Sequence, residues 1–307
     1  MNNPMLSTTE RDHVELPLVT IIAPCFNAEK YLEQAIAGIY SQTYANIEVI
    51  IVDDGSTDKS VEMLETLQKV HGFQFYRQAN QGVSAALNHG LRYAQGKYVS
   101  TPDLDDIMLP ESVAIRVAYM EEHPDAGLVG ANSRYINSEG KVLKDEKRKH
   151  SSHYDFADIL AKARVCGAPV ALYRMDALRA AGFYDPTIKV QDFQITLRIA
   201  HAGYFIDVIP VLITLYRRHP NNLSRRYKRM LVADMAAIAP YRGHPAYESG
   251  RAEVIHKALK YAVVEDKADA FRLLLQLPVR QWSKVTLQRV RRLLLRWRPV
   301  KRTVQKG

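Results

Sequence analysis

The first half of the chain alternates between two hydrophobic periodicities, and this alternation limits the folds that it can adopt. Short, β-rich apolar runs that end in turns are separated by segments whose apolar residues recur at helical spacing. Alternation of this kind predicts βαβ units and a mostly parallel sheet flanked by helices, which is an α/β fold. We expect strands at 18–24, 47–52, 73–76 and 98–100, and helices at 31–40, 61–70 and 83–94.

The second half of the chain is less regular. The charged, weakly apolar stretch 141–150 is typical of a loop, and we expect a helix that begins at Pro110, because proline suits the first helical position. Residues 190–202 predict a helix and 211–216 a strand, and from about residue 225 the spacing is helical throughout. The expected parts are an N-terminal tail (1–17), an α/β domain (18–225) and a helical C-terminal extension (226–307).

The basic charge of the chain is concentrated at its C-terminal end. The formal net charge is +9, but residues 270–307 contain eleven Lys and Arg and no Asp or Glu, so subtracting eleven leaves −2 for the rest. This asymmetry indicates an anionic partner for the C-terminal segment.

That segment also has an amphipathic pattern. A basic amphipathic helix with Trp at both ends is typical of helices that lie on anionic membranes, so we favour a membrane surface as its partner. The helix could instead pack its apolar face on the protein, and nucleic-acid binding is the least favoured interpretation. The apolar face would carry Trp282, Thr286, Val290, Leu293, Leu294 and Trp297, and the basic face Arg289, Arg292 and Arg296.

The cysteine content and the length of the apolar runs indicate the cellular compartment in which the protein is expected. Two cysteines, Cys25 and Cys166, suggest no disulfide framework and favour a reducing compartment. The polar N-terminus lacks the apolar stretch of a secretion signal, and no apolar run approaches the roughly 18 residues of a membrane span. We therefore expect a cytoplasmic protein, peripheral on the inner face of the plasma membrane.

Polar and acidic clusters follow three of the expected strands, where open α/β sheets bind their ligands. Acids at a strand end, such as Asp53 and Asp54, can accept hydrogen bonds from a base or a ribose. One of Ser56, Thr57 and Asp58 is expected to cap the following helix. The clusters are Pro24-Cys25-Phe26-Asn27, Asp53-Asp54-Gly55-Ser56-Thr57-Asp58 and Asp103-Leu104-Asp105-Asp106.

The third cluster has the chemistry of a metal site. Asp103 and Asp105, two positions apart on extended backbone, point the same way, and two nearby carboxylates stay ionised at low cost only beside a cation. Mg²⁺ and Mn²⁺ suit such ligands, which usually act together with substrate phosphates. On this pattern alone, a solvated acidic turn is the more common structure.

Several blocks in order resemble glycosyltransferase family 2, from about Val19 to Ser224. No single block is specific for this family, but the occurrence of all of them in the family's order is specific. The blocks are VTIIAPCFN (19–27), QTY (42–44), EVIIVDDGSTD (48–58), NQGVSAA (80–86), DLDD (103–106), GFYD (182–185), QDF (191–193) and YRRH (216–219).

The resemblance implies a GT-A fold, an inverting mechanism and a nucleotide-diphosphate sugar donor, most readily a UDP-sugar. It makes Asp192 the general base that deprotonates the acceptor hydroxyl, Asp105 the metal ligand, and His219 a second group near the metal or diphosphate. Without the family, Asp192 would be an ordinary acid at a helix N-terminus and His219 a surface residue. The implied donor-binding residues are Pro24, Asn27, Asp53, Asp54, Asn80, Gly82, Asp103 and Leu104.

Three departures from the family pattern qualify these roles. Gln191 stands where the family often has Glu before the base, and Leu87 stands where it often has Arg. The Gln-x-x-Arg-Trp motif of processive members is missing, because Leu293 precedes Arg296-Trp297 at the required spacing. This absence favours transfer of a single sugar per event.

The sequence thus predicts an inverting, Mn²⁺- or Mg²⁺-dependent glycosyltransferase. We expect its acceptor to be a glycan, specifically a lipid-linked precursor of lipopolysaccharide or another cell-surface polysaccharide. A sugar-nucleotide nucleotidyltransferase is an alternative, but Pro24-Cys25-Phe26-Asn27 is not the Gly-rich loop that it needs. A non-catalytic nucleotide-sugar binding module would lack the base or the metal acid, and Asp105 and Asp192 are both present.

Overall fold

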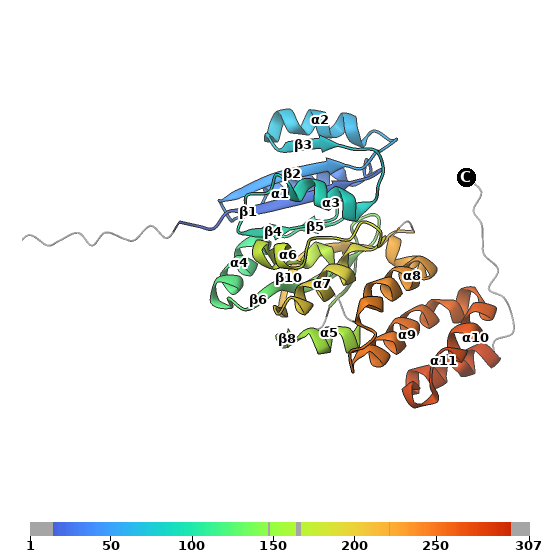
Figure 1. The fold of residues 1–307 in the computed structure, drawn as a ribbon. Coiled ribbons are helices and arrows are strands. Elements are labelled where there is room, and N and C mark those ends of the chain that lie inside the picture. Colours follow the sequence, from blue (N-terminus) through green and yellow to red (C-terminus); the bar gives the residue numbers. More distant parts are fainter. Residues whose placement is uncertain (1–14, 147, 164–166, 221, 296–307) are drawn as a thin grey trace, which may run out of the picture.

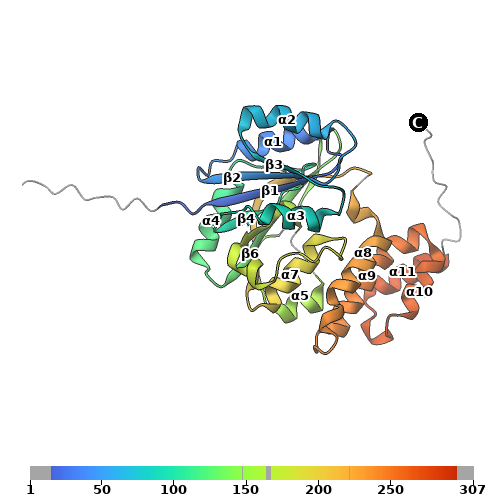
Figure 2. The same cartoon turned by 45° about the horizontal axis from the view of Figure 1, so that its top comes forward.

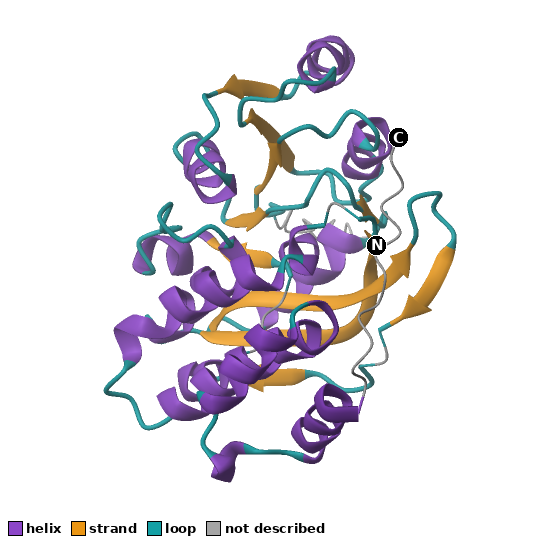
Figure 3. Ribbon diagram, turned by 90° about the vertical axis from the view of Figure 1, so that its right-hand side faces the viewer, coloured by secondary structure: helices purple, strands orange, loops and turns teal. Residues whose placement is uncertain are grey.

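The computed structural model describes residues 15–295 except 147, 164–166 and 221. Its centre is a ten-stranded sheet, with helices on both sides of the strands (Figure 3). The α/β fold predicted from the periodicities is confirmed, as is the helical C-terminal region. Most of the predicted tail 1–17, as well as Cys166 and Trp297, lies outside the described residues.

The elements follow one another in βα alternation at first and in helices alone at the end. The strands are β1 (Val19–Cys25), β2 (Ile47–Asp53), β3 (Gln74–Arg77), β4 (Tyr98–Ser100), β5 (Ile107–Met108), β6 (Ala126–Ile136), β7 (Val142–Asp145), β8 (Ser152–Tyr154), β9 (Leu172–Arg174) and β10 (Phe205–Arg217). The α-helices are α1 (Leu32–Tyr40), α2 (Ser60–His71), α3 (Val83–Leu91), α4 (Ser112–Glu122), α5 (Phe156–Lys162), α6 (Met175–Ala180), α7 (Gln191–His201), α8 (Tyr227–Ile238), α9 (Tyr247–Glu265), α10 (Lys267–Leu275) and α11 (Lys284–Leu295). Short 3₁₀ turns include η1 (Ala168–Val170).

The sheet runs β3-β2-β1-β4-β9-β6-β10-β5 and is parallel only in part. Strands β1 to β4 pair in parallel, as the βαβ pattern predicts, and β6 pairs in parallel with β10. Strand β9 runs antiparallel to both β4 and β6, and β5 and β8 run antiparallel to β10. The predicted parallel arrangement therefore holds for the first half, whereas the second half is mixed.

The expected loop at 141–150 is wrong in its first part, which forms strand β7. This strand pairs with β6 as a hairpin, closed by a turn with Gly140 at φ +83°. All four residues of β7 are exposed. A strand that buries neither face has no apolar alternation, so hydrophobic periodicity could not reveal it.

Several boundaries also differ from expectation, and α3 ends at Leu91 rather than at residue 94. Helix α4 begins at Ser112 rather than Pro110, and β10 runs from Phe205 to Arg217 rather than over 211–216. Buried Ser112 is hydrogen-bonded to the guanidinium of buried Arg116 one turn later, with the Ser112 Oγ accepting at 2.9 Å. In β10 the polar Asp207 is fully buried, which hides the strand pattern at its start.

The helical extension α8–α11 has its own small core but is joined to the sheet domain. Figures 1 and 2 place α9, α10 and α11 at the end of the molecule opposite β3 and α2. Helix α9 serves both parts: Val254 packs in the main core, while Ile255 and Leu259 belong to the second. Gly250 of α9 lies so close to α5 that a Cβ would stand 2.0 Å from the carbonyl oxygen of Leu160. No described helix is long and apolar enough to cross a membrane.

The apolar face expected on the C-terminal helix is mostly covered by protein. Thr286 and Leu293 are buried, and Trp282 and Val290 pack on the second core. Arg289, assigned to the basic face, donates a hydrogen bond to the carbonyl of His256 in α9 at 2.7 Å. The packing interpretation therefore describes this face, and the exposed charge of α11 includes Arg291 and Arg292.

Candidate active site

The carboxyl ends of β1 and β2 lie side by side and are tied by polar contacts. Cys25 is in register with Asp53, and the Asn27 side-chain oxygen accepts a hydrogen bond from the backbone N–H of Thr57 at 2.8 Å. Asn27 has φ +51°, a left-handed conformation that Asn tolerates. Pro24 lies at the same edge, opposite Val52.

The two acids at the end of β2 have different surroundings. Asp53 is buried and accepts hydrogen bonds from the backbone N–H groups of Gly55 and Ser56 at 3.2–3.3 Å, so it closes its own turn. The N-cap of α2 is Lys59, so none of Ser56, Thr57 and Asp58 occupies the expected cap position. Asp58 does accept a hydrogen bond from the N–H of Ser60, the first residue of the helix, at 3.0 Å.

Asp54 fastens the neighbouring loop to this strand end. One of its oxygens accepts from the Gln78 amide at 2.8 Å and from the Gln81 N–H at 2.9 Å, and the other accepts from the Gly82 N–H at 2.8 Å. Asn80, in the same loop, is exposed. Pro24, Asn27, Asp53, Asp54, Asn80 and Gly82 are thus brought to one edge of the sheet.

The acidic cluster that follows β4 is compact. Asp103, Asp105 and Asp106 can each place one carboxylate oxygen within 4.8 Å of the others. Burial and the charge of Asp105 raise the pKa of both Asp103 and Asp106 well above the ordinary range. Leu104 is buried in the main core, so its side chain is turned away from this acidic group.

Residues from the end of β10 and the loop after it complete this cluster. The His219 Nε2 lies 2.8 Å from the Asp105 Oδ2, and the Asn222 amide donates to the same oxygen at 3.4 Å. The Arg217 N–H donates to Asp106 at 2.6 Å, and its guanidinium donates to the Asp105 carbonyl at 2.9 Å. His219 therefore contacts Asp105.

Arg217 and Arg218, which are neighbours in the YRRH block, have unlike environments. Arg217 is 1% exposed, stacks on the Tyr31 ring at 4.4 Å and donates to the Gln34 side chain at 2.7 Å. It is part of the scaffold and is not solvated. Arg218 is exposed and lies 4.2 Å from the Tyr135 ring.

Asp192, in the first turn of α7, has an unusual environment for an aspartate. One of its oxygens, Oδ1, is buried with no hydrogen-bond partner among the described residues. Burial raises the pKa of Asp192 to about 7, helped by the charge of Asp234 and opposed by the backbone N–H of Ala168. The helix N-terminus alone would favour the ionised form, so desolvation outweighs the macrodipole here.

Asp192 and the acidic cluster belong to one polar site. The charge of Asp192 raises the pKa of Asp103 and also of the buried phenol Tyr184. Thr101, Tyr173 and Tyr184 place buried hydroxyls in the same site, where they interact with one another. Their hydroxyls make the surroundings of Asp192 polar.

Sequence reasoning missed three residues of this site. Asp106 stood in the quoted motif but was not assigned to the metal group, and Arg217 and Asn222 were not expected at Asp105 or Asp106. The side chains of Arg217 and Asn222 reach the cluster across more than 110 positions of sequence. The YRRH block was the available signal for Arg217, and only the chain fold brings Asn222 to Asp105.

Comparison with known proteins agrees with this arrangement. The model of the family described as glycosyl transferase family 2 matches residues 20–182. An uncharacterized glycosyltransferase of Methanocaldococcus jannaschii is 29% identical over 71% of this chain and 77% of its own length. Chondroitin synthase of Escherichia coli is 28% identical over 62% of this chain, which spans 27% of that protein.

Two solved structures share the fold. S. aureus TarS 1–349 in complex with UDP-GlcNAc has a TM-score of 0.64 and 17% identity over 86% of this chain and 82% of its own. The mannosyltransferase PcManGT from Pyrobaculum calidifontis, in complex with GDP-Man and Mn²⁺, has a TM-score of 0.63 and 18% identity over 91% and 86%. With more than half of its length matched by the family model, the chain belongs to glycosyl transferase family 2 and is a glycosyltransferase.

Proposed function

We propose that the protein transfers a single sugar, with inversion, from a UDP-sugar to a hydroxyl of a glycan acceptor. One observation carries this proposal: an unpartnered carboxylate oxygen of Asp192 shares a polar site with the acidic cluster at Asp103, Asp105 and Asp106. Inversion requires a base on the acceptor side and a stabilised leaving group on the other. The two acidic groups meet these requirements separately.

Asp192 is the proposed general base. Its Oδ1 is free to accept the proton of an acceptor hydroxyl, provided that the hydroxyl comes within about 2.6–3.2 Å. A pKa of about 7 makes this carboxylate a stronger base than an ordinary aspartate while leaving it ionised at neutral pH in a large fraction of molecules. The neighbouring hydroxyls of Tyr173 and Tyr184 keep the surroundings of this carboxylate polar.

The acidic cluster is the proposed cation site. Its donor set suits Mn²⁺ or Mg²⁺, since it offers only oxygen atoms, and the Asp106 Oδ2 is buried without a partner among the described residues. A divalent cation held by Asp103, Asp105 and Asp106 would balance the charge of the departing diphosphate. His219 and Asn222 position the Asp105 carboxylate, and Arg217 positions that of Asp106.

The edge formed by β1, β2 and the 78–82 loop is the proposed nucleoside site. It presents Pro24 and Asn27, with Asn80 exposed beside them, while buried Asp54 holds the 78–82 loop in place through both of its oxygens. TarS with UDP-GlcNAc supports a uridine nucleotide, and PcManGT with GDP-Man makes guanosine the competitor to test.

A nucleotide screen tests this proposal. We expect UDP with Mn²⁺ to raise the melting temperature of the protein, whereas GDP, dTDP and CMP raise it less and UDP without metal has little effect. A ligand at 100 times its Kd stabilises the native state by about 2.7 kcal/mol. If no nucleotide shifts the melting temperature in the presence of Mn²⁺, the donor site is wrong. A shift with GDP alone would replace uridine with guanosine.

We further propose that the acceptor is a lipid-linked precursor of lipopolysaccharide or another cell-surface polysaccharide, met by a peripheral enzyme at the inner face of the plasma membrane. The support is the exposed basic charge of the C-terminal segment, which includes Arg291 and Arg292 on α11. Arginines at an anionic bilayer contribute roughly 1 kcal/mol each.

Co-sedimentation with vesicles tests the membrane part. The protein is expected to bind vesicles that contain anionic lipid and not neutral ones. Arg291→Gln/Arg292→Gln should weaken this binding about thirtyfold. The matched variant Lys69→Gln/Arg92→Gln removes two exposed charges elsewhere and should bind as the wild type does. Equal binding to neutral and anionic vesicles, or none, would refute the membrane partner.

A further inference from the structure

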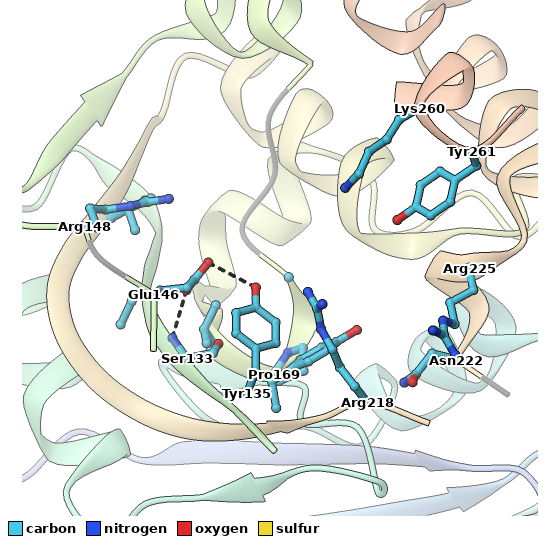
Figure 4. Close-up of a pocket in the computed structure, with 15 residues that line it drawn as sticks. Ser133, Tyr135, Glu146, Arg148, Pro169, Arg218, Asn222, Arg225, Lys260 and Tyr261 are labelled. Carbon is cyan, nitrogen blue, oxygen red and sulfur yellow. Dashed lines mark hydrogen bonds between the residues drawn. The ribbon is translucent and has the colours of Figure 1, made fainter. Parts of the chain in front are cut away.

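A pocket of about 530 Å³ lies between the sheet and the helical extension. One wall comes from β6 and β10, and the opposite side comes from α9, which contributes Lys260 and Tyr261 (Figure 4). The proposed nucleoside site does not use this space, because β4 and β9 separate β1 from β6 in the sheet. The pocket can therefore hold a part of the reactants other than the nucleoside of the donor.

The pocket is strongly cationic. Four basic side chains line it, against a single carboxylate, Glu146. Among the described residues, none of the four forms a salt bridge. The four are Arg148, Arg218, Arg225 and Lys260.

The single carboxylate does not neutralise this charge. Glu146 accepts hydrogen bonds from the Ser133 N–H at 2.9 Å and from the Tyr135 hydroxyl at 3.4 Å, both on β6 (Figure 4). It is thus occupied in holding the hairpin strand against the sheet. The Arg148 Nη1 is buried and has no hydrogen-bond partner among the described residues. A buried guanidinium N–H without an acceptor is costly, and an anionic ligand would supply one.

The pocket adjoins both halves of the proposed reaction centre. Asn222 lines the pocket and also donates to Asp105 at 3.4 Å. Gly167 and Pro169 also line the pocket, and the residue between them, Ala168, donates a backbone hydrogen bond to Asp192. A molecule whose hydroxyl approaches Asp192 can therefore extend into the cationic space and toward α9.

We propose that this pocket holds an anionic group, a phosphate or a carboxylate, of the acceptor while the acceptor hydroxyl faces Asp192. This inference rests on the proposed function and adds the chemical class of its acceptor. Arg148, Arg225 and Lys260 bind the anion, with Arg218 held against the Tyr135 ring between them. The helical extension thereby becomes part of acceptor selection, because Lys260 and Tyr261 belong to it.

Ligand-observed NMR titration tests this proposal in full-length protein saturated with UDP and diamagnetic Mg²⁺, so that the donor site is filled. The probes are glucose 6-phosphate, glucuronate and decyl phosphate, with uncharged glucose as reference. We expect at least one anionic probe to bind with a Kd on the order of 1 mM and glucose to bind much more weakly. The probe that binds best distinguishes a sugar phosphate, a sugar carboxylate and a lipid phosphate.

Matched variants locate the binding. Arg225→Gln/Lys260→Gln removes two exposed cations from the pocket and should weaken the best probe about tenfold. Arg148→Gln should do the same from the opposite wall. Lys69→Gln/Arg92→Gln removes two exposed cations outside the pocket lining and should have no effect.

The outcomes separate this inference from the proposed function. If UDP binds with Mg²⁺ but the anionic probes bind no better than glucose, or bind all variants equally, the anion pocket is refuted and the glycosyl-transfer proposal stands. If UDP does not bind, the donor site fails first, and probe binding that responds to the pocket variants still establishes the anion site.

Discussion

Replacing Asp192 with Asn is expected to abolish sugar transfer and, at pH 8, to raise the melting temperature. Asn retains the shape of the side chain but cannot take a proton from the acceptor hydroxyl. Loss of a general base costs typically 10²–10⁴-fold in rate. Transfer measured at saturating donor should fall by this amount, while UDP binding in the presence of Mn²⁺ stays within about twofold, because Asp192 is not placed at the nucleoside.

The gain in stability follows from the environment of the carboxyl group. Its pKa is about 7 in the folded protein and near 4 in an unfolded chain, so the folded state holds the extra proton between these values. Stability is therefore lost as the pH rises from about 4 to about 7, and Asn removes that loss. We expect about 1–3 kcal/mol of stabilisation at pH 8 and little at pH 4.

The control is Asp125→Asn, which removes a carboxylate from an exposed position. It should leave both transfer and melting temperature nearly unchanged at either pH. An Asp192→Asn enzyme that keeps more than a tenth of wild-type transfer would show that another group is the base. A variant that is inactive and destabilised at pH 8 would point instead to a structural role.

The pH profile of the wild type gives a second readout of the same group. Transfer requires ionised Asp192, so kcat/KM should fall as the pH drops through the pKa of this residue. A bound cation near Asp103 lowers that pKa, whereas the charge of Asp234 raises it and Lys257 pairs with Asp234 at 3.6 Å. The inflection is expected between about 4 and 7. A flat profile over this range would contradict base catalysis by Asp192.

Hydrophobic periodicity predicted the first half of the fold well, because β1 and β2 are buried runs between amphipathic helices. It failed where a strand has no buried face, as in β7. The C-terminal helix shows the opposite limit. Its apolar face was predicted only in part, because Leu294 is 68% exposed. A stripe of Trp282, Val290 and Leu293 suits a bilayer and a second core equally, and only the position of α9 decides between them.

The candidate site was predictable to the extent that it lies at strand ends. Asp54 and Asp105 could be found there because chain order places them at the carboxyl ends of β2 and β4. The contact between His219 and Asp105 could not be derived from spacing, since it depends on the length and direction of β10. Composition also does not reveal that the Asp53 carboxylate is hydrogen-bonded within its own turn. The raised pKa of Asp192 likewise depends on burial, which only the folded structure shows.

Replacing Asp105 with Asn is expected to remove metal-dependent donor binding. Asp105 is the sharpest probe of the cation site, because its side chain is 30% exposed and can be changed to Asn with little effect on packing. Asp106 is a poorer choice, since it also accepts from the Arg217 N–H at 2.6 Å and its loss would disturb the end of β10. The variant should fold with nearly the wild-type melting temperature.

In this variant, UDP should bind equally with and without Mn²⁺, and transfer should fall by a factor on the order of 10³, the scale seen when one group that stabilises transition-state charge is lost. His219→Gln is the matched test of the neighbouring group. If His219 only positions Asp105, this variant should keep metal-dependent UDP binding and weaken it moderately. If it is itself a ligand, the metal dependence should vanish as in Asp105→Asn. Wild-type Mn²⁺ dependence in the Asp105 variant would exclude the acidic cluster as the cation site, because no other described residues with three clustered acidic, His or Cys side chains could replace it.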